Sequence, residues 1–181
     1  MIEPLRELFK HFKEESEKIR EELARESEEV KVLMKTDDEK IKEKITELYN
    51  TIVKQDALQP GLNKLYYTII DYAKQLDDEK ASFILNAFHN KIYITKADIQ
   101  ETLKEMYNIV NGKRKKKDGK NELLMLAINL FKHYATMKSL TLILCDIKDL
   151  RESEACRVNT ESNNKLKDNI QYLLDLLLHK N

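Results

Sequence analysis

Glycine and proline are scarce in this chain, and their scarcity limits the possible folds more than any other feature. The 181 residues include three glycines, two prolines and no tryptophan. A β-sandwich needs many tight turns, and a nucleotide-binding α/β fold needs a glycine-rich loop, so both classes lack the residues that they require. The sequence therefore predicts an all-α protein, which we expect to be a bundle of six to seven helices with a long N-terminal helix.

Apolar residues recur at helical spacing along most of the chain and divide it into four parts. We expect a long amphipathic N-terminal helix, a helical bundle core, a basic loop and C-terminal helices that complete the bundle, at residues 1–35, 36–110, 111–120 and 121–181. Thr36 and Glu39 have the spacing of a capping box, which predicts that the first core helix begins near Asp37. The pattern is typical of one domain with an added N-terminal arm.

Four helices are expected in the bundle core, with apolar stripes over residues 41–53, 62–76, 81–88 and 99–110. A break at Gln59-Pro60-Gly61 separates the first two, Thr95 opens the fourth, and Asn111-Gly112 ends it. Leu76 and Ile84 are among the side chains expected to face inward.

Two helices are expected in the C-terminal part, one from Asn121 to about residue 150 and one with an apolar stripe over residues 166–178. Residues 140–145 are apolar on nearly every side, which leaves a buried helical turn or a lone strand open; we favour the helix. Residues 151–164 are polar and aperiodic and are expected to form a linker.

The N-terminal segment carries two interleaved rows of apolar residues at heptad spacing, as in a coiled-coil seam. The rod predicted over residues 5–34 is longer than a compact domain of this size needs, so part of it is expected to project or to pair with something. Two interpretations stay open: a solvated outer face, and a helix that binds a protein partner or a second copy of the chain. The candidate partner-binding side chains are Phe9, Phe12, Ile19, Leu23 and Val30.

A run of cations stands out in a chain whose formal net charge is zero. Residues 112–120 hold six basic side chains and one acidic side chain between two glycines, which places the run in a loop. Three interpretations compete: a solvated connector, a nuclear-import-like tract, and a phosphate-binding loop for RNA or an acidic partner. The candidate binding residues are Lys113, Arg114, Lys115, Lys116, Lys117 and Lys120.

The remaining composition bears on compartment. Zero net charge and a pI near 6.9 give no general attraction to nucleic acid or anionic lipid. Two cysteines, Cys145 and Cys156, are too few for a disulfide framework or a structural zinc site, so a reducing compartment fits best. No apolar run approaches the roughly 20 residues that span a bilayer. We expect an intracellular, cytoplasmic protein, with nuclear import left open by the basic run.

No catalytic or metal-binding constellation is recognisable. The four histidines lie on different expected helices without a second ligand at metal-binding spacing, and they are His11, His89, His133 and His179. Acidic pairs such as Asp77-Asp78 stand where helix N-termini are expected and suit capping. Cys145 is expected to be an inert core thiol, whereas Cys156 is expected in the polar linker, where it can be exposed. We expect no cofactor, no metal and no small-molecule substrate.

The order of signals in residues 36–110 carries a resemblance. The matching features are a helix ending in Leu48-Tyr49, a Leu58-Gln59-Pro60 break, an apolar helix starting near Leu65, an Ala81-x-x-Ile84 turn, and Leu103-Lys104 in a closing helix. This order resembles the C-terminal helical domain shared by the outer-layer scaffold subunit of the COPII vesicle coat and the steroid receptor RNA activator protein. That family tends to have an aromatic residue, a histidine and a tryptophan where this chain has Asp78, Leu85 and Gln100.

The resemblance implies a small helical bundle that binds protein partners or RNA-associated regulators and performs no chemistry. Together with the residue patterns, it leads us to expect a non-enzymatic helical interaction or scaffold module. The alternative is a nucleic-acid or ribonucleoprotein-binding protein that uses the basic run at residues 113–120.

Overall fold

The computed structural model of the chain describes residues 10, 11, 14, 15, 17–19, 34–112, 119–147 and 150–179. Its elements follow one another as α2 (Met34–Leu48), the π-helix η2 (Tyr49–Lys54), α3 (Gln59–Leu76), α4 (Glu79–Val110), α5 (Gly119–Cys145) and α6 (Glu154–Leu178). These described residues contain helices and turns but no strand. The all-α prediction is therefore confirmed, whereas most of the expected N-terminal helix lies outside the described residues.

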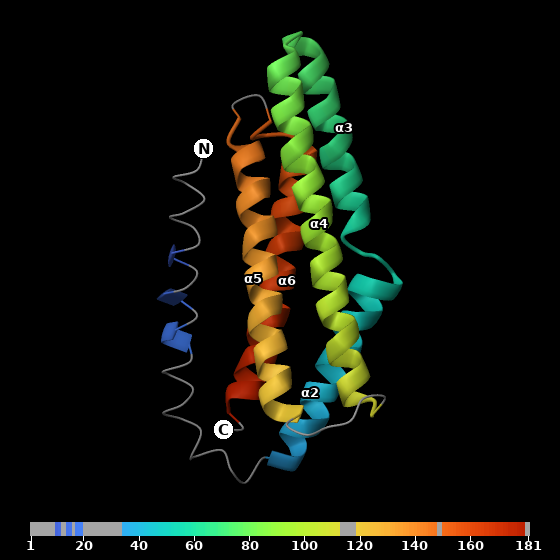
Figure 1. Cartoon of the computed structure of the whole chain (residues 1–181), viewed down its shortest axis with the longest axis vertical. Coiled ribbons are helices and arrows are strands. Elements are labelled where there is room, and N and C mark those ends of the chain that lie inside the picture. The colour runs from blue at the N-terminus through green and yellow to red at the C-terminus, as the bar shows by residue number, and fades with distance from the viewer. Residues whose placement is uncertain are drawn as a thin grey trace.

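The helices form a bundle arranged like a four-helix bundle, except that two consecutive segments of the chain together take the place of one helix (Figure 1). α5 packs between α4 and α6, and both α2 and α3 contact α4 and α6. α2 with η2 therefore fills one half of the fourth position, and α3 fills the other half. Helices α4, α5 and α6 run along the long axis of the molecule (Figure 1).

The core lies along the axis of this bundle, and every position contributes side chains that are almost completely buried. Burial of such apolar surface is the main favourable term in folding. The most buried members include Ile45, Leu65, Ile92, Ile99, Leu103, Met106, Leu130, Ile170 and Leu173.

Helix α4 is continuous where the sequence predicts two helices, because Thr95 is not a cap. Its hydroxyl donates to the carbonyl oxygen of Lys91 at 2.8 Å, one turn back in the same helix. Threonine can make this bond inside a helix as well as capping one, so the capping interpretation of Thr95 was wrong. The predicted left-handed stop after the helix is confirmed at Gly112, whose φ is 71°.

Helix α5 includes residues 140–145, so the helical alternative for this segment is confirmed. Leu140 and Leu144 are buried, and the buried hydroxyl of Thr141 donates to the carbonyl oxygen of Met137 at 2.8 Å. The helix ends at Cys145 rather than near residue 150.

Helix α6 begins at Glu154, within the segment that we expected to be a polar linker. Ser153 caps it, because its Oγ accepts a hydrogen bond from the amide of Cys156 at 3.2 Å. The buried face of these first turns uses small and polar residues, among them Asn159. The Asn159 amide is satisfied by two carbonyl oxygens, that of Gly61 at 2.9 Å and that of Ala155 at 2.8 Å. Apolar periodicity could not show this part of the helix, so the linker prediction was wrong.

Candidate interaction surface

The turn between α3 and α4 projects from one end of the bundle (Figure 1). Lys64 is in the second turn of α3, and its Nζ lies 3.3 Å from Oε1 of Glu154, the first residue of α6. The later turns of α3 therefore extend past the start of α6, where α4 is the helix beside them (Figure 1). We call this projecting part, residues 71–84, the hairpin tip.

The chain reverses at the hairpin tip through two aspartates. Asp77 adopts the left-handed conformation with φ 49°, which aspartate tolerates better than most residues. Asp78 caps α4, because its carboxylate accepts from the amide of Lys80 at 3.0 Å and from that of Ala81 at 3.3 Å. The expected capping role is confirmed for Asp78.

Three large apolar side chains of the hairpin tip face solvent. Phe83 is 75% exposed, Ile84 is 42% exposed and Leu76 is 41% exposed. The prediction that Leu76 and Ile84 face inward was wrong, because α5 ends and α6 begins before this level and no other described helix covers them. The sequence did carry a signal for Phe83, which lies off the apolar stripe of its own helix.

The charged side chains of the hairpin tip are exposed and mostly acidic. Residues 71–80 contain four acids and two lysines, which gives the segment a net charge of −2. Among the described residues, Asp71, Asp77 and Glu79 form no ion pair. Exposed apolar surface therefore lies beside carboxylates that no cation of the described chain neutralises.

A polar network fixes the other end of α3 to α4. Asp56, left-handed with φ 50°, accepts from Lys96 Nζ at 2.9 Å and from Gln100 Nε2 at 2.8 Å. Lys96 also donates to Gln59 Oε1, and its side chain is only 11% exposed. Gln100 spans the corner by donating to Ile52 O at 3.0 Å. A buried ammonium group needs such partners, so the network holds the corner before α3 in one geometry against α4.

His89 lies inside the α3–α4 pair, 1% exposed, between the rings of Tyr66 and Tyr93. Burial lowers the pKa of His89, and a hydrogen bond with the Leu62 backbone opposes the shift. Its Nε2 has no hydrogen-bond partner among the described residues. No group of three His, Cys, Asp or Glu side chains suited to a metal ion occurs within the described ranges.

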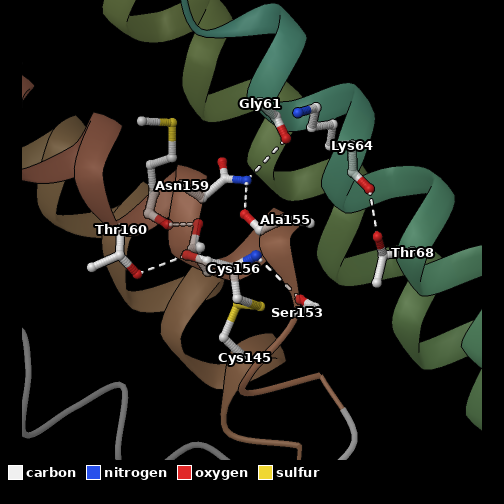
Figure 2. The surroundings of a disulfide bond; sticks show 11 residues. Gly61, Lys64, Thr68, Cys145, Ser153, Ala155, Cys156, Asn159 and Thr160 are labelled. Atoms are coloured by element: carbon white, nitrogen blue, oxygen red, sulfur yellow. Dashed lines mark hydrogen bonds between the residues drawn. A yellow bond between two sulfur atoms is a disulfide. The ribbon is translucent and has the colours of Figure 1, made fainter.

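The two cysteines form a disulfide (Figure 2), which joins α5 to α6 at the end of the bundle from which the hairpin tip projects (Figure 1). Cys145 ends α5 and Cys156 lies in the first turn of α6, with Cα atoms 5.9 Å apart. The expectation of two separate thiols was wrong, and Cys156 is buried rather than exposed. Disulfides persist in oxidising compartments, so the pair removes the basis for expecting a reducing one.

Most of the predicted N-terminal seam, including Phe9, Phe12, Leu23 and Val30, lies outside the described residues, and its partner-binding role stays a prediction. Ile19, the remaining seam residue, is half-buried. Two described side chains of this segment, His11 and Glu15, lie 3.2 Å apart. They border a small cavity on α5 and α6 together with Phe131, Tyr134, Ala135, Lys138, Ser139 and Lys167.

The environment of this small cavity shifts two ionisable groups. Burial raises the pKa of Tyr134, and the nearby carboxylates of Asp168 and Glu15 add to the effect. Burial lowers the pKa of Lys138, reinforced by Lys167 and opposed by Glu15. The Tyr134 hydroxyl has no hydrogen-bond partner in the part of the chain that the structure describes.

The basic run begins and ends at the opposite end of the bundle from the hairpin tip. Residues 113–118 lie outside the described residues, and so does the side chain of Lys120. The binding role of the basic run therefore stays a prediction. The flanking Gly112 and Gly119 follow α4 and open α5 at the base of the bundle (Figure 1).

An open pocket of about 550 Å³ lies beside these flanks, and we call it the base pocket. Its lining is mostly apolar, with three charged side chains among the rest. The lining residues are Asp38, Glu39, Ile41, Lys42, Ile109, Val110, Gly119, Leu123 and Leu177.

A second open groove, of about 470 Å³, runs between η2 and α6. Leu48, Ile52 and Leu166 contribute apolar lining, and Glu161 and Lys165 contribute charged lining. Its mixed lining does not single out one class of ligand.

Comparison with known proteins adds no relative: no family model, no curated protein and no solved structure matches this chain. Among the described helices, none has the length and apolarity that crossing a bilayer requires.

Proposed function

We propose that this chain is a non-enzymatic protein-interaction module that binds a protein partner through the hairpin tip. The exposure of Phe83, at 75%, carries the proposal, because a large aromatic side chain at the end of a helical pair is the kind of anchor that fills a pocket on a partner. Leu76 and Ile84 enlarge the apolar surface around this anchor. Contiguous exposed apolar surface commonly marks an interaction site.

The surroundings of the hairpin tip support this proposal. The capped turn and the Asp56–Lys96 network hold α3 and α4 in one geometry, so little conformational entropy is lost on binding. The acidic charge of residues 71–80 disfavours anionic lipid and favours a partner with basic side chains around an apolar pocket. The resemblance of residues 36–110 to a partner-binding helical domain implies the same class of function.

The proposal is tested by a tip variant in which Phe83→Ser and Ile84→Ser are combined. The matched control is Ile94→Ser, because Ile94 is also on α4 and is 62% exposed, away from the hairpin tip. Both variants should melt close to the wild type, since exposed substitutions change stability little.

The measurement is affinity capture from nuclease-treated extracts of cells that make the protein, followed by quantitative mass spectrometry. Proteins retained by the wild type and by the Ile94→Ser control should be lost from the tip variant. Equal retention by all three proteins would contradict the proposal. Retention that disappears for the wild type after nuclease treatment would favour the nucleic-acid alternative instead.

A further inference from the structure

We propose that the hairpin tip binds an amphipathic helix of a protein partner, in which lysine or arginine side chains flank an apolar stripe. This inference rests on the proposed function and names the shape and the charge of the partner at that site. The partner helix packs on the side of the α3–α4 pair that α5 and α6 cover in the body of the bundle. The apolar pattern, the exposure and the charge at this end of the molecule lead to it.

The apolar stripe of α3 continues beyond the helices that cover it. Leu62, Ile69 and Leu76 follow one another at steps of seven residues and therefore lie on one face of the helix. Leu62 is 2% exposed and Ile69 is 1% exposed, whereas Leu76 is 41% exposed. Exposure rises here because α5 ends and α6 begins before this level (Figure 1). Leu76 therefore occupies a core-facing position that lacks a neighbouring helix among the described residues.

Helix α4 repeats this arrangement. Ile84 precedes Asp98 by two steps of seven residues, so the two side chains share one side of the helix. Asp98 faces α5, because its Oδ2 lies 4.0 Å from Nδ1 of His133. Ile84 thus continues the α5-facing side of α4, and it is 42% exposed. We call Leu76 and Ile84 together the inner face of the hairpin tip.

The neighbour that fits the inner face is a helix. In the body of the bundle α3 packs against α6 and α4 packs against α5, so the same two sides receive helices there. Side chains at helical spacing form ridges and grooves that match those of another helix. An amphipathic helix laid along such an apolar surface is a recurring mode of recognition. Phe83, one residue before Ile84, points about 100° away around α4 and borders the inner face, where a pocket beside the partner helix can receive it.

The apex of the hairpin tip is acidic. Asp77 and Glu79 are exposed, and neither forms an ion pair among the described residues. Residues 71–80 keep a net charge of −2 although they include Lys74 and Lys80. Carboxylates without a cation beside apolar surface favour lysine or arginine on the partner.

The connection between α5 and α6 lies at the level where the inner face begins, and it is acidic as well (Figure 1). Its described residues include exposed Asp146 and Glu152 against exposed Arg151. Glu154, which opens α6, is already paired with Lys64 at 3.3 Å. A basic helix on the inner face therefore meets carboxylates at both of its borders. A second copy of the hairpin tip would bring like charges together, so it fits this face less well.

The test measures binding of labelled synthetic peptides to the full chain by fluorescence anisotropy. The probe is a peptide of about 18 residues, long enough to form a helix, with leucine at helical spacing and lysine and alanine elsewhere. A permuted peptide of the same composition scatters the leucines around the helix, and a third peptide carries glutamate in place of lysine. Because the permuted peptide has the same charge as the probe, the difference between them reports the apolar stripe.

Three variants locate the site. Leu76→Ser with Ile84→Ser removes the inner face, and Asp77→Asn with Glu79→Gln removes two charges of the apex. Ile94→Ser is the matched control for a lost exposed apolar side chain on α4. Asparagine tolerates the left-handed conformation of Asp77, so the charge variant keeps the turn. Circular dichroism melting shows that each variant is folded before binding is measured.

The wild type and the Ile94→Ser control should bind the lysine peptide at least about tenfold more tightly than the permuted or the glutamate peptide. The inner-face variant should lose about tenfold or more of this affinity, because the partner stripe no longer buries apolar surface there. The charge variant should bind about two- to fivefold more weakly at low salt. That difference should shrink at high salt, because salt screens exposed charges.

Three results would overturn the inference. Equal binding of the lysine and permuted peptides excludes recognition of an amphipathic helix, and equal binding by the wild type and the inner-face variant places the peptide elsewhere. Wild-type dimers in sedimentation velocity that are lost in the inner-face variant would make a second copy the occupant. If the lysine peptide fails to bind while captured proteins are still lost from the Phe83→Ser, Ile84→Ser variant, this inference alone falls and the proposed function stands.

Discussion

Removing the Cys145–Cys156 disulfide should lower the free energy of unfolding by about 3 kcal/mol. The two cysteines are 11 residues apart in the chain. In the chain-entropy model, closing a loop of roughly that length in the unfolded state removes about 9 to 10 cal/mol/K, which is about 3 kcal/mol at 25 °C. Since 1 kcal/mol shifts the melting temperature of a protein of this size by about 2 to 4 °C, the loss should appear as about 6 to 12 °C.

The assay compares the melting of three samples: the oxidised wild type, the wild type with a phosphine reductant, and a Cys145→Ala, Cys156→Ala double variant. Both the reduced and the double-variant samples should melt lower by a similar amount, and the reductant should not change the melting of the double variant. Alkylation of the unreduced, denatured protein followed by mass spectrometry should label neither cysteine. Labelling of both thiols, or three equal melting temperatures, would refute the pairing.

Four other changes test the packing and the electrostatics. Leu174→Ala should lower the free energy of unfolding by about 2 to 5 kcal/mol in urea denaturation, because the leucine is buried in the core, and a loss below about 1 kcal/mol would contradict its core role. Tyr134→Phe should leave that free energy unchanged or raise it by up to about 1 kcal/mol, since the buried hydroxyl has no partner among the described residues; a clear loss would reveal one. Burial lowers the pKa of His89 below 6.5, so stability that is complete above that pH should fall as the pH drops and the unfolded chain gains a proton. Melting curves of His89→Phe between pH 7 and 5 should be flatter than those of the wild type, and parallel curves would refute this role. Replacing residues 113–117 with glutamine should leave the melting temperature nearly unchanged, and a large shift would show that the cations stabilise the fold.

Local sequence signals determined those features that depend on a few neighbouring residues. The apolar stripe of α3 and that of the later turns of α6 follow from helical periodicity, since residues three and four apart share one face. The Asp78 cap and the Gly112 stop follow from the short-range hydrogen bonding of aspartate and from the left-handed freedom of glycine. These signals were sufficient to predict an all-α bundle.

Features that depend on where other helices begin and end were decided by the tertiary structure. Leu76 and Ile84 continue the apolar stripes of their helices but face solvent, because α5 and α6 do not extend to the hairpin tip. Asn159 is polar yet buried, because the Gly61 carbonyl of α3 lies within hydrogen-bond distance of its amide. The pairing of Cys145 with Cys156 likewise required α5 to end and α6 to begin side by side. Apolar periodicity indicates which side chains share one face of a helix. Whether that face is buried or paired depends on a neighbouring helix at the same level of the bundle, and the position of that neighbour is decided by the tertiary packing.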